Sequence, residues 1–301
     1  MNNKRRLFST VLCVAALTAG LFVSGCGSDK AGGIGSVVSS VVDGGDEKAA
    51  AKLNTLIDAT NRFNSDNASF AQFQAEGLAK LKGGFAEGAI ANQPHFDRLQ
   101  ADLEKAKKEG STFKEVDAER DNVLNILNEL VPVYKDLTAY DDSKAYMNDG
   151  GAKGKELAAK YVAAVEKFDA AYAKFNETLN KVNAEQSKKQ IEKLKKDGKK
   201  GYAAAMESTL RLTELVDKLE KAPQNADKAA VEKELSEIEA LLKSINNDRG
   251  QVLADRYNSV VGSVRQVLAD SNENNLDEMI QSFNAYIDTY NSTNPEQFDG
   301  K

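Results

Sequence analysis

The residue types that carry most enzyme chemistry are scarce in this chain. Its 301 residues include one histidine, two cysteines and no tryptophan. A single His95 excludes a multi-histidine metal site, and a catalytic triad would have to use it although no nucleophile elbow occurs elsewhere. The 46 acidic residues guarantee close pairs such as Asp141-Asp142 by chance. We therefore predict that the protein is not an enzyme and has no catalytic residue, metal site or cofactor, and we interpret His95 as a surface or turn residue.

Cys26 is the residue whose predicted chemistry is clearest. Three basic residues, Lys4 to Arg6, precede an apolar stretch from Leu7 to about Val23. This order predicts a secretory signal peptide over residues 1–25, because the stretch is too short and too poorly flanked for a stable membrane span. Val23-Ser24-Gly25-Cys26 resembles the lipobox of bacterial lipoproteins, in which the signal is removed and the cysteine is acylated through its thiol. Cys26 is therefore the predicted lipidation site, where acyl chains such as palmitate anchor the protein in membrane lipid.

The exported chain is acidic and retains no free thiol. Removal of residues 1–25 takes away three positive charges and no negative ones, so the formal net charge changes from -6 to -9. An acidic body argues against nucleic acid as a partner. Cys13 leaves with the signal and Cys26 is consumed by lipid, so no disulfide is expected. Gly27 and Asp29 follow the lipidated cysteine and, by similarity to sorting rules in enteric bacteria, favour the outer membrane facing the periplasm if the host is Gram-negative.

The remainder of the chain predicts helices. Residues 26–45 comprise the lipidated cysteine and a Gly/Ser-rich flexible tether, in which Val37 to Val42 is better interpreted as spacer than as a strand. From Asp46 onward apolar residues recur at helical spacing, and steps of four and three residues from Tyr161 to Val182 form a heptad seam. We predict an all-α fold over residues 46–301: an elongated multi-helix bundle with long coiled-coil-like helices.

Helix boundaries are predicted from capping residues and helix breakers. The expected boundary residues are Thr112 with Glu115, Asn225, and Asn275 with Glu278 for helix starts, Val131 and Pro132 for a kink or break, Gly198 and Gly201 for an interruption, and Gly250 for a bend.

A short polar pattern recurs near both ends of the helical region. Both copies read apolar, Asn, two residues, Ile-Asp, two residues, Asn, and on a helix each forms a polar strip beside an apolar stripe. The strips either hydrogen-bond at the core boundary of two neighbouring helices and fix their register, or converge on a ligand or partner. The candidate contact residues are Asn54, Asp58 and Asn61 in the first copy and Asn284, Asp288 and Asn291 in the second.

These elements resemble those of the YiiG-like bacterial lipoproteins, a family built on a helical domain of unknown function. The resemblance rests on the Asn-x-x-Ile-Asp-x-x-Asn helix near the start, its echo near the end, and the passage from Leu137 to Leu157. It implies an envelope lipoprotein with a helical domain and no established activity. It supplies no catalytic residues.

Two other segments have the composition of binding sites. Residues 150–155 carry the glycines and lysine of a phosphate loop, but Asp149 replaces its first glycine and Glu156 its Ser or Thr, so a turn before a helix is the better interpretation. Residues 188–201 hold seven lysines against Glu192 and Asp197. Such a patch either touches anionic lipid or an acidic partner, or is a solvated helix face.

These features predict a lipid-anchored protein of the bacterial cell envelope. Its helical bundle is expected to act as a non-enzymatic interaction or structural module, with membrane lipid bound through acylated Cys26 and an envelope protein as partner. The alternative is a carrier or sensor that binds a small ligand in an inter-helix groove lined by Tyr140, Tyr146 and the polar strips.

Overall fold

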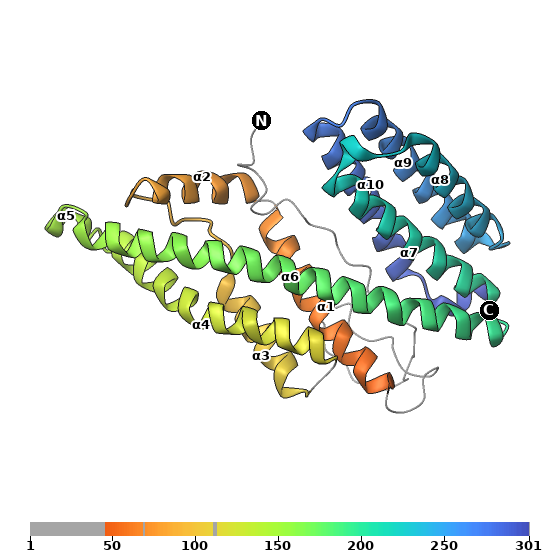
Figure 1. Cartoon of the computed structure of the whole chain (residues 1–301), viewed down its shortest axis with the longest axis horizontal. Helices are drawn as coiled ribbons and strands as arrows, with labels where there is room; N and C mark the ends of the chain where they lie inside the picture. Colours follow the sequence, from red (N-terminus) through yellow and green to blue (C-terminus); the bar gives the residue numbers. More distant parts are fainter. Residues whose placement is uncertain (1–45, 69, 111–112, 301) are drawn as a thin grey trace. The chain divides into compact units, whose positions relative to one another are not determined.

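The structure, a computed structural model, describes residues 46–68, 70–110 and 113–300, and every regular element in this part of the chain is a helix (Figure 1). The predicted all-α bundle is therefore confirmed, whereas the predicted signal peptide, Cys26 and the tether lie outside the described residues. The α-helices are α1 (Asp46–Ala68), α2 (Ala71–Lys82), α3 (Phe96–Lys108), α4 (Lys114–Asp142), α5 (Tyr146–Asp149), α6 (Ala152–Lys196), α7 (Lys200–Lys221), α8 (Lys228–Lys243), α9 (Asp248–Ala269) and α10 (Glu273–Ser292), and the 3-10 helices are η1 (Pro223–Asn225) and η2 (Pro295–Asp299).

Contacts between the described residues group them into two compact units. The first comprises residues 55–181, and the second comprises residues 182–300 together with the first turns of α1 up to Asn54. Helix α6 supplies its first thirty residues, 152–181, to the first unit and its last fifteen to the second. Each unit therefore has its own set of packed helices and is described separately.

Aromatic side chains from three helices form the centre of the first unit. Phe63 of α1 lies 6.1 Å from Phe96 of α3 between ring centroids, and Phe168 of α6 packs on both rings at 5.9 and 5.0 Å. Helix α3 also packs along α4, whose Leu127 and Leu130 are fully buried. Burial of such large apolar side chains is the main source of stability for a unit that has no disulfide among its described residues.

The heptad seam predicted for α6 is confirmed. Of its members from Tyr161 to Val182, every residue is buried except Tyr172, which is half-buried. The helix extends beyond the seam at both ends and reaches 45 residues, about 68 Å at 1.5 Å per residue. It ends where Gly198 takes a φ of 76°, a left-handed conformation that glycine adopts without strain. The predicted interruption before Gly201 therefore separates α6 from α7.

The second unit is a bundle in which α9 packs against α10 and α8, while α7 packs against α8 and α10. Its core is one continuous cluster of buried apolar side chains. Residues of all four helices contribute to it, including Leu212, Ile238, Tyr257 and Phe283, each at most 1% exposed. The apolar stripes read from the sequence after residue 200 are thus the residues that hold this unit together.

The 3-10 helix η2 covers the start of α7. Phe298 stacks on the rings of Tyr202 and Tyr290. The Asp299 carboxylate accepts hydrogen bonds from the backbone N–H groups of Gly201 at 2.7 Å and Tyr202 at 3.4 Å. A Cβ on Gly201 would lie 2.0 Å from the Phe298 carbonyl oxygen, so the approach requires glycine. An acidic side chain from the end of the chain therefore caps α7, whose own N-cap residue, Lys199, makes no side-chain capping bond.

Two predicted helix starts are wrong by two or three residues, at α8 and α10. Helix α4 begins at Lys114, and Thr112 of the predicted capping box lies outside the described residues. Asn225 belongs to η1, and the N-cap of α8 is Asp227, which accepts from the N–H groups of Ala229 and Ala230. Asp227 caps α8 in place of Asn225 because its carboxylate reaches two free backbone amides.

The starts of the last two helices are also corrected. Helix α9 begins at Asp248, so Gly250 lies in its first turn instead of at a bend, pressed against Ile245. Asn272, not Asn275, is the N-cap of α10, and it accepts from the Asn275 N–H group. In both cases an asparagine side chain one turn earlier satisfies a free amide and extends the helix backward.

Pro132 does not end its helix. Helix α4 continues through it to Asp142, although proline removes one backbone hydrogen bond. Pro132 is exposed while Leu130 and Val131 beside it are buried. Packing of the opposite face therefore outweighs the lost bond on the solvent side. Of the two predicted outcomes, the break is wrong and the kink stays a prediction.

Candidate functional site

The first predicted strip lies on α1, at the edge of the core. Asn54, Asp58 and Asn61 are half-buried, whereas Leu56 and Ile57 between them are fully buried. Burial raises the pKa of Asp58 to about 6, and the positive charge of Arg62 partly opposes this rise. Asn54 belongs to the second unit, whereas Asp58 and Asn61 belong to the first. The strip is therefore a core-boundary feature of α1, as the helical spacing predicts.

The second predicted strip lies on α10 and belongs wholly to the second unit. Asp288 is exposed, while Asn284 and Asn291 are half-buried. Each of these two asparagines has a buried amide oxygen without a hydrogen-bond partner among the described residues. A buried acceptor without a donor is costly, so both positions can accept a hydrogen bond that the described chain does not supply. Whether the two strips meet each other, a ligand or a partner stays a prediction.

The two tyrosines predicted to line a groove are packed together with a third aromatic residue. Phe85 lies 5.1 Å from Tyr140 and 5.4 Å from Tyr146 between ring centroids. The Tyr140 hydroxyl donates to the Asp149 carboxylate at 2.6 Å, and a hydrogen bond to Glu87 raises the pKa of Tyr146 to about 12. The polar ends of both tyrosines therefore already have partners within this cluster.

The glycine-rich turn before α6 is not an anion-binding loop. Gly150 and Gly151 both have positive φ, and the Asp149 carboxylate accepts hydrogen bonds from the N–H groups of Gly151 at 2.9 Å and Lys153 at 3.1 Å. These are amides that a bound phosphate would need. An anion would also meet the negative charge of Asp149 there, which confirms the interpretation of residues 150–155 as a turn that leads into a helix.

A buried polar network in the first unit escaped the sequence interpretation. The Gln74 side chain donates to the Asn67 Oδ1 atom at 3.1 Å, and Tyr161 donates to the Gln93 Oε1 atom at 2.8 Å. Gln93 in turn donates to the Gln74 carbonyl oxygen at 3.3 Å. All four residues are at most 4% exposed. The network joins α1, α2, the loop before α3 and α6, and its buried hydrogen bonds hold α2 in place. The Gln74 Oε1 atom is the exception in this network, because it is buried without a hydrogen-bond partner among the described residues.

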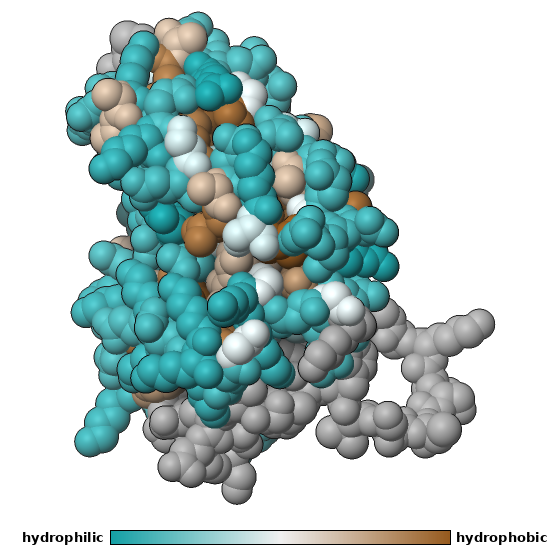
Figure 2. Space-filling view, turned by 90° about the vertical axis from the view of Figure 1, so that its right-hand side faces the viewer, coloured by the Kyte–Doolittle hydropathy of each residue, from teal (hydrophilic) through white to brown (hydrophobic). Residues whose placement is uncertain are grey.

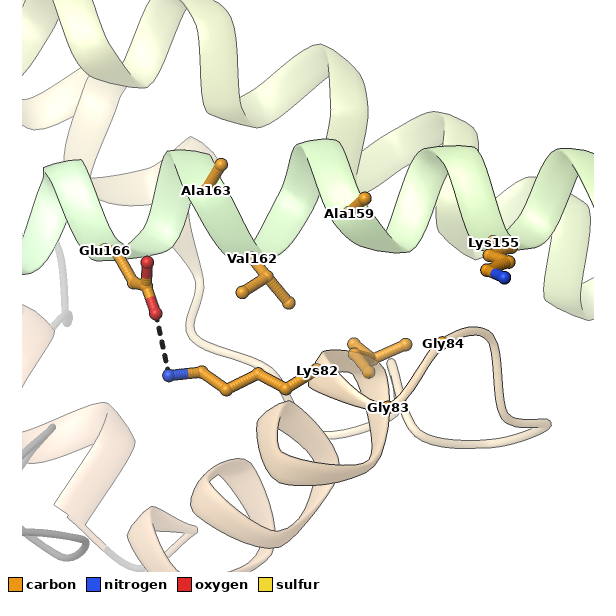
Figure 3. A pocket seen from close by; sticks show the side chains of 9 residues that line it. Lys82, Gly83, Gly84, Lys155, Ala159, Val162, Ala163 and Glu166 are labelled. Carbon is orange, nitrogen blue, oxygen red and sulfur yellow. Dashed lines mark ion pairs between the residues drawn. The ribbon is translucent and has the colours of Figure 1, made fainter.

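One groove is lined by α2 and α6 within the first unit (Figure 3). It has a volume of about 330 Å³. Ala159, Val162 and Ala163 form its apolar wall on α6, and Lys82 at the end of α2 makes an ion pair with Glu166 at 2.7 Å across one end. Lys155 lies at the opposite end. The groove thus combines an apolar wall with charged groups, the Lys82–Glu166 pair and Lys155, a combination suited to a small amphiphilic ligand.

Asp169 lies one turn beyond Glu166 on α6. Its pKa is raised more than that of any other aspartate in the described part of the chain. Burial raises its pKa to about 7, Lys82 lowers it and Glu166 raises it further. Its Oδ2 atom is buried and has no hydrogen-bond partner among the described residues. Nothing in the heptad pattern distinguishes Asp169 from an ordinary surface aspartate, so sequence reasoning missed it.

His95 is the exposed N-cap residue of α3, which confirms the prediction of a surface or turn histidine.

Two kinds of site are absent from the described part of the chain. Among the described residues, no group of three or more His, Cys, Asp or Glu side chains is placed to hold a metal ion. No described helix is long and apolar enough to cross a membrane. Most of the face seen in Figure 2 is hydrophilic, with apolar residues visible in narrow strips between polar ones.

Comparison with protein families identifies a family model that matches the helical part of the chain. A family model described as "Protein of unknown function (DUF3829)" covers residues 47–254, from α1 into α9. No curated protein and no solved structure matches the chain significantly.

Proposed function

We propose, since this chain belongs to the DUF3829 family of proteins of unknown function, that it is a lipid-anchored protein of the bacterial cell envelope. Its helical units act as a non-enzymatic interaction or structural module, with an envelope protein as the expected partner. The two packed units support this role, because their long helices offer extended contact surfaces. The family supplies no activity that could argue for a different role.

The observation that carries the proposal is the order of residues before the helices. Basic residues, an apolar stretch, small residues and Cys26 occur in the sequence required for lipoprotein processing. Several acyl chains on one cysteine hold a protein to a bilayer durably, at about 0.8 kcal/mol for each buried methylene. The placement of Gly27 and Asp29 further favours the outer membrane, facing the periplasm, in a Gram-negative host.

Metabolic labelling tests the anchor directly. Cells that express the full chain are grown with an alkyne analogue of palmitate, and the label on the protein is measured after membrane fractionation. Cys26→Ser should abolish the label. Cys13→Ser is the matched control, because Cys13 lies inside the predicted signal and should leave the label unchanged. Equal labelling of the wild type and Cys26→Ser would refute lipid anchoring at this residue.

The groove between α2 and α6 favours a second candidate function, a carrier or sensor of small amphiphilic ligands. Its supporting observation is the volume of about 330 Å³ with an apolar wall on α6. A thermal-shift screen of metabolites should then find a ligand that stabilises the wild type but not Ala163→Leu, which fills the groove. Ala173→Leu, at an exposed position of the same helix, is the control. A stabilisation that Ala163→Leu retains would exclude this groove as the site.

A further inference from the structure

A cluster of lysines lies where α6 ends and α7 begins. Seven lysines occur between residues 188 and 200, against Glu192 and Asp197. Two of the lysines have ion-pair partners: Lys188 contacts Glu214 at 3.1 Å, and Lys195 contacts Glu207 at 2.8 Å. The other five have no ion pair with a described residue, and we call them the α6–α7 lysine cluster: Lys189, Lys193, Lys196, Lys199 and Lys200.

Helix geometry explains only part of this cluster. Lys193 and Lys196 lie in the last turn of α6, where the negative end of the helix dipole favours cations. Lys199 and Lys200 occupy the N-cap and first position of α7, where the same effect disfavours positive charge. Serine, threonine, aspartate or asparagine is preferred at an N-cap, and lysine supplies no acceptor there. Local helix stability therefore does not account for these two lysines.

The capping of α7 is supplied from elsewhere in the second unit. The Asp299 carboxylate of η2 accepts from the Gly201 N–H group at 2.7 Å, which frees the N-cap position from its usual role. The first turn of α7 contains no acidic residue. All members of the cluster are exposed except Lys199, which is half-buried. The cluster thus lies at one end of the bundle with two carboxylates on its own helix turns, Asp197 and Glu192, and Glu192 is paired with Lys195 at 3.5 Å.

We infer that the α6–α7 lysine cluster binds the anionic head groups of phospholipids in the membrane to which the protein is anchored. The inference rests on the proposed lipid anchor. The chain between Cys26 and Asp46 spans at most about 70 Å when fully extended, so the anchor keeps the helices close to the bilayer. The exported chain is acidic as a whole, so an anionic surface attracts it only through a local excess of positive charge. The α6–α7 lysine cluster supplies such an excess.

Lysines on a membrane-facing surface act additively. Each lysine near an anionic bilayer strengthens partitioning roughly fivefold, and the effect falls off within a Debye length of about 10 Å at moderate salt. Four contacting lysines together change partitioning on the order of 10²-fold or more. The predicted interaction is consequently strong at low ionic strength and is lost at high salt.

Lysine footprinting of the mature lipoprotein tests the inference. The protein is purified from membranes and reconstituted through its own anchor into vesicles of phosphatidylcholine alone or of phosphatidylcholine mixed with phosphatidylglycerol. Acetylation rates of individual lysines are then measured by mass spectrometry. We expect the cluster to react roughly fivefold more slowly in the phosphatidylglycerol vesicles, and high salt should remove the protection. Lys105 and Lys108, exposed in the last turn of α3, are internal controls whose rates should not change.

A variant pair gives an independent measurement. The cluster variant replaces four lysines by glutamine, a good helix former, and so removes four charges: Lys189→Gln, Lys193→Gln, Lys196→Gln and Lys200→Gln. The control variant removes four charges elsewhere: Lys105→Gln, Lys108→Gln, Lys135→Gln and Lys228→Gln. On phosphatidylglycerol vesicles, Lys199 should be acetylated as slowly in the control variant as in the wild type, and faster in the cluster variant. Circular dichroism establishes that both variants remain folded.

The outcomes separate the inference from its premise. The mass of the N-terminal peptide in the same digest reports acylation of Cys26, so absence of the lipid refutes the anchor. With the anchor present, equal acetylation in both kinds of vesicle overturns the lipid inference. Protection that appears only when envelope proteins are added also overturns it, and assigns the cluster to an acidic protein partner.

Discussion

Substitution of Asp169 by asparagine should stabilise the protein at alkaline pH. Asp169 is half-buried, its Oδ2 atom has no hydrogen-bond partner among the described residues, and burial raises its pKa from 3.8 to about 7. A carboxyl whose pKa is raised in the folded state stabilises that state while it is protonated. This contribution is fully present below pH 3.8 and is lost as the pH rises through about 7.

The size of the effect follows from the shift. About three pKa units correspond to about 4 kcal/mol, since one unit is worth 1.36 kcal/mol. Because Asp169 retains some solvent exposure, we expect about 1–3 kcal/mol after solvent screening. Asp169→Asn preserves the shape and cannot ionise. Its free energy of unfolding should therefore exceed that of the wild type by about this amount at pH 8 and by much less at pH 5.

Urea unfolding followed by far-UV circular dichroism measures this difference across the pH range. Asp288→Asn is the matched control, because Asp288 is exposed on α10 and its substitution should leave the pH profile of the wild type unchanged. An Asp169→Asn profile that still falls from pH 5 to pH 8 as steeply as the wild type would refute the assignment of the charge penalty to Asp169. A variant that is less stable than the wild type at pH 8 would do so as well.

Four other changes test the packing and the polar groups. Glu220→Gln should raise the stability of the second unit at pH 8, because burial and the charge of Asp217 raise the pKa of Glu220 from 4.5 to about 7. In the same urea experiment the gain should shrink as the pH falls below 7 and vanish below pH 4.5. Gly201→Ala should lower the melting temperature by forcing η2 away from α7, at a cost of about 2 kcal/mol or more. Gly262→Ala, within α9 and with no atom within 4 Å of the added Cβ, should raise the melting temperature slightly, and equal effects of the two changes would refute the close approach at Gly201. If the strips contact a ligand or partner, cells that carry Asn54→Ala combined with Asn284→Ala should show a phenotype of the deletion strain. Reduced protein stability with every wild-type phenotype intact would leave the strips a purely structural role.

The sequence was sufficient for the fold class because each α6 seam residue repeats at the period of a helix. From Tyr161 to Val182 the steps of four and three place every apolar side chain on one face, and burial of that face follows directly. Helix ends were less predictable. Asp227 and Asn272 cap their helices although Asn225 and Asn275 are equally good capping residues, because the choice depends on which side chain reaches a free amide once the neighbouring turn has formed.

The cap of α7 was beyond sequence reasoning for a related reason. Asp299 accepts from the Gly201 N–H group across 98 positions of the chain, and no local pattern connects the two residues. The same holds for Gln93 and Tyr161, which meet across 68 positions in the polar network of the first unit. Spacing along one helix predicts which face is buried, but not which distant element covers it.

The long-range cap also changes the interpretation of the lysines beside it. From composition alone, seven lysines near a bend are most simply a solvated helix face. In the structure, two of the lysines stand at a helix N-terminus, where a local acid would be both the better cap and the better charge. Because Asp299 takes over the cap, the chain keeps α7 stable and retains positive charge at that position. Asp299→Asn should therefore lower the stability of the second unit without changing the charge of the α6–α7 lysine cluster, whereas replacement of Lys200 by glutamate should stabilise α7 by about 0.3–1 kcal/mol. A stabilising Lys200→Glu variant that loses protection on phosphatidylglycerol vesicles would show that the lysine is kept at a cost in stability for its contact with the membrane.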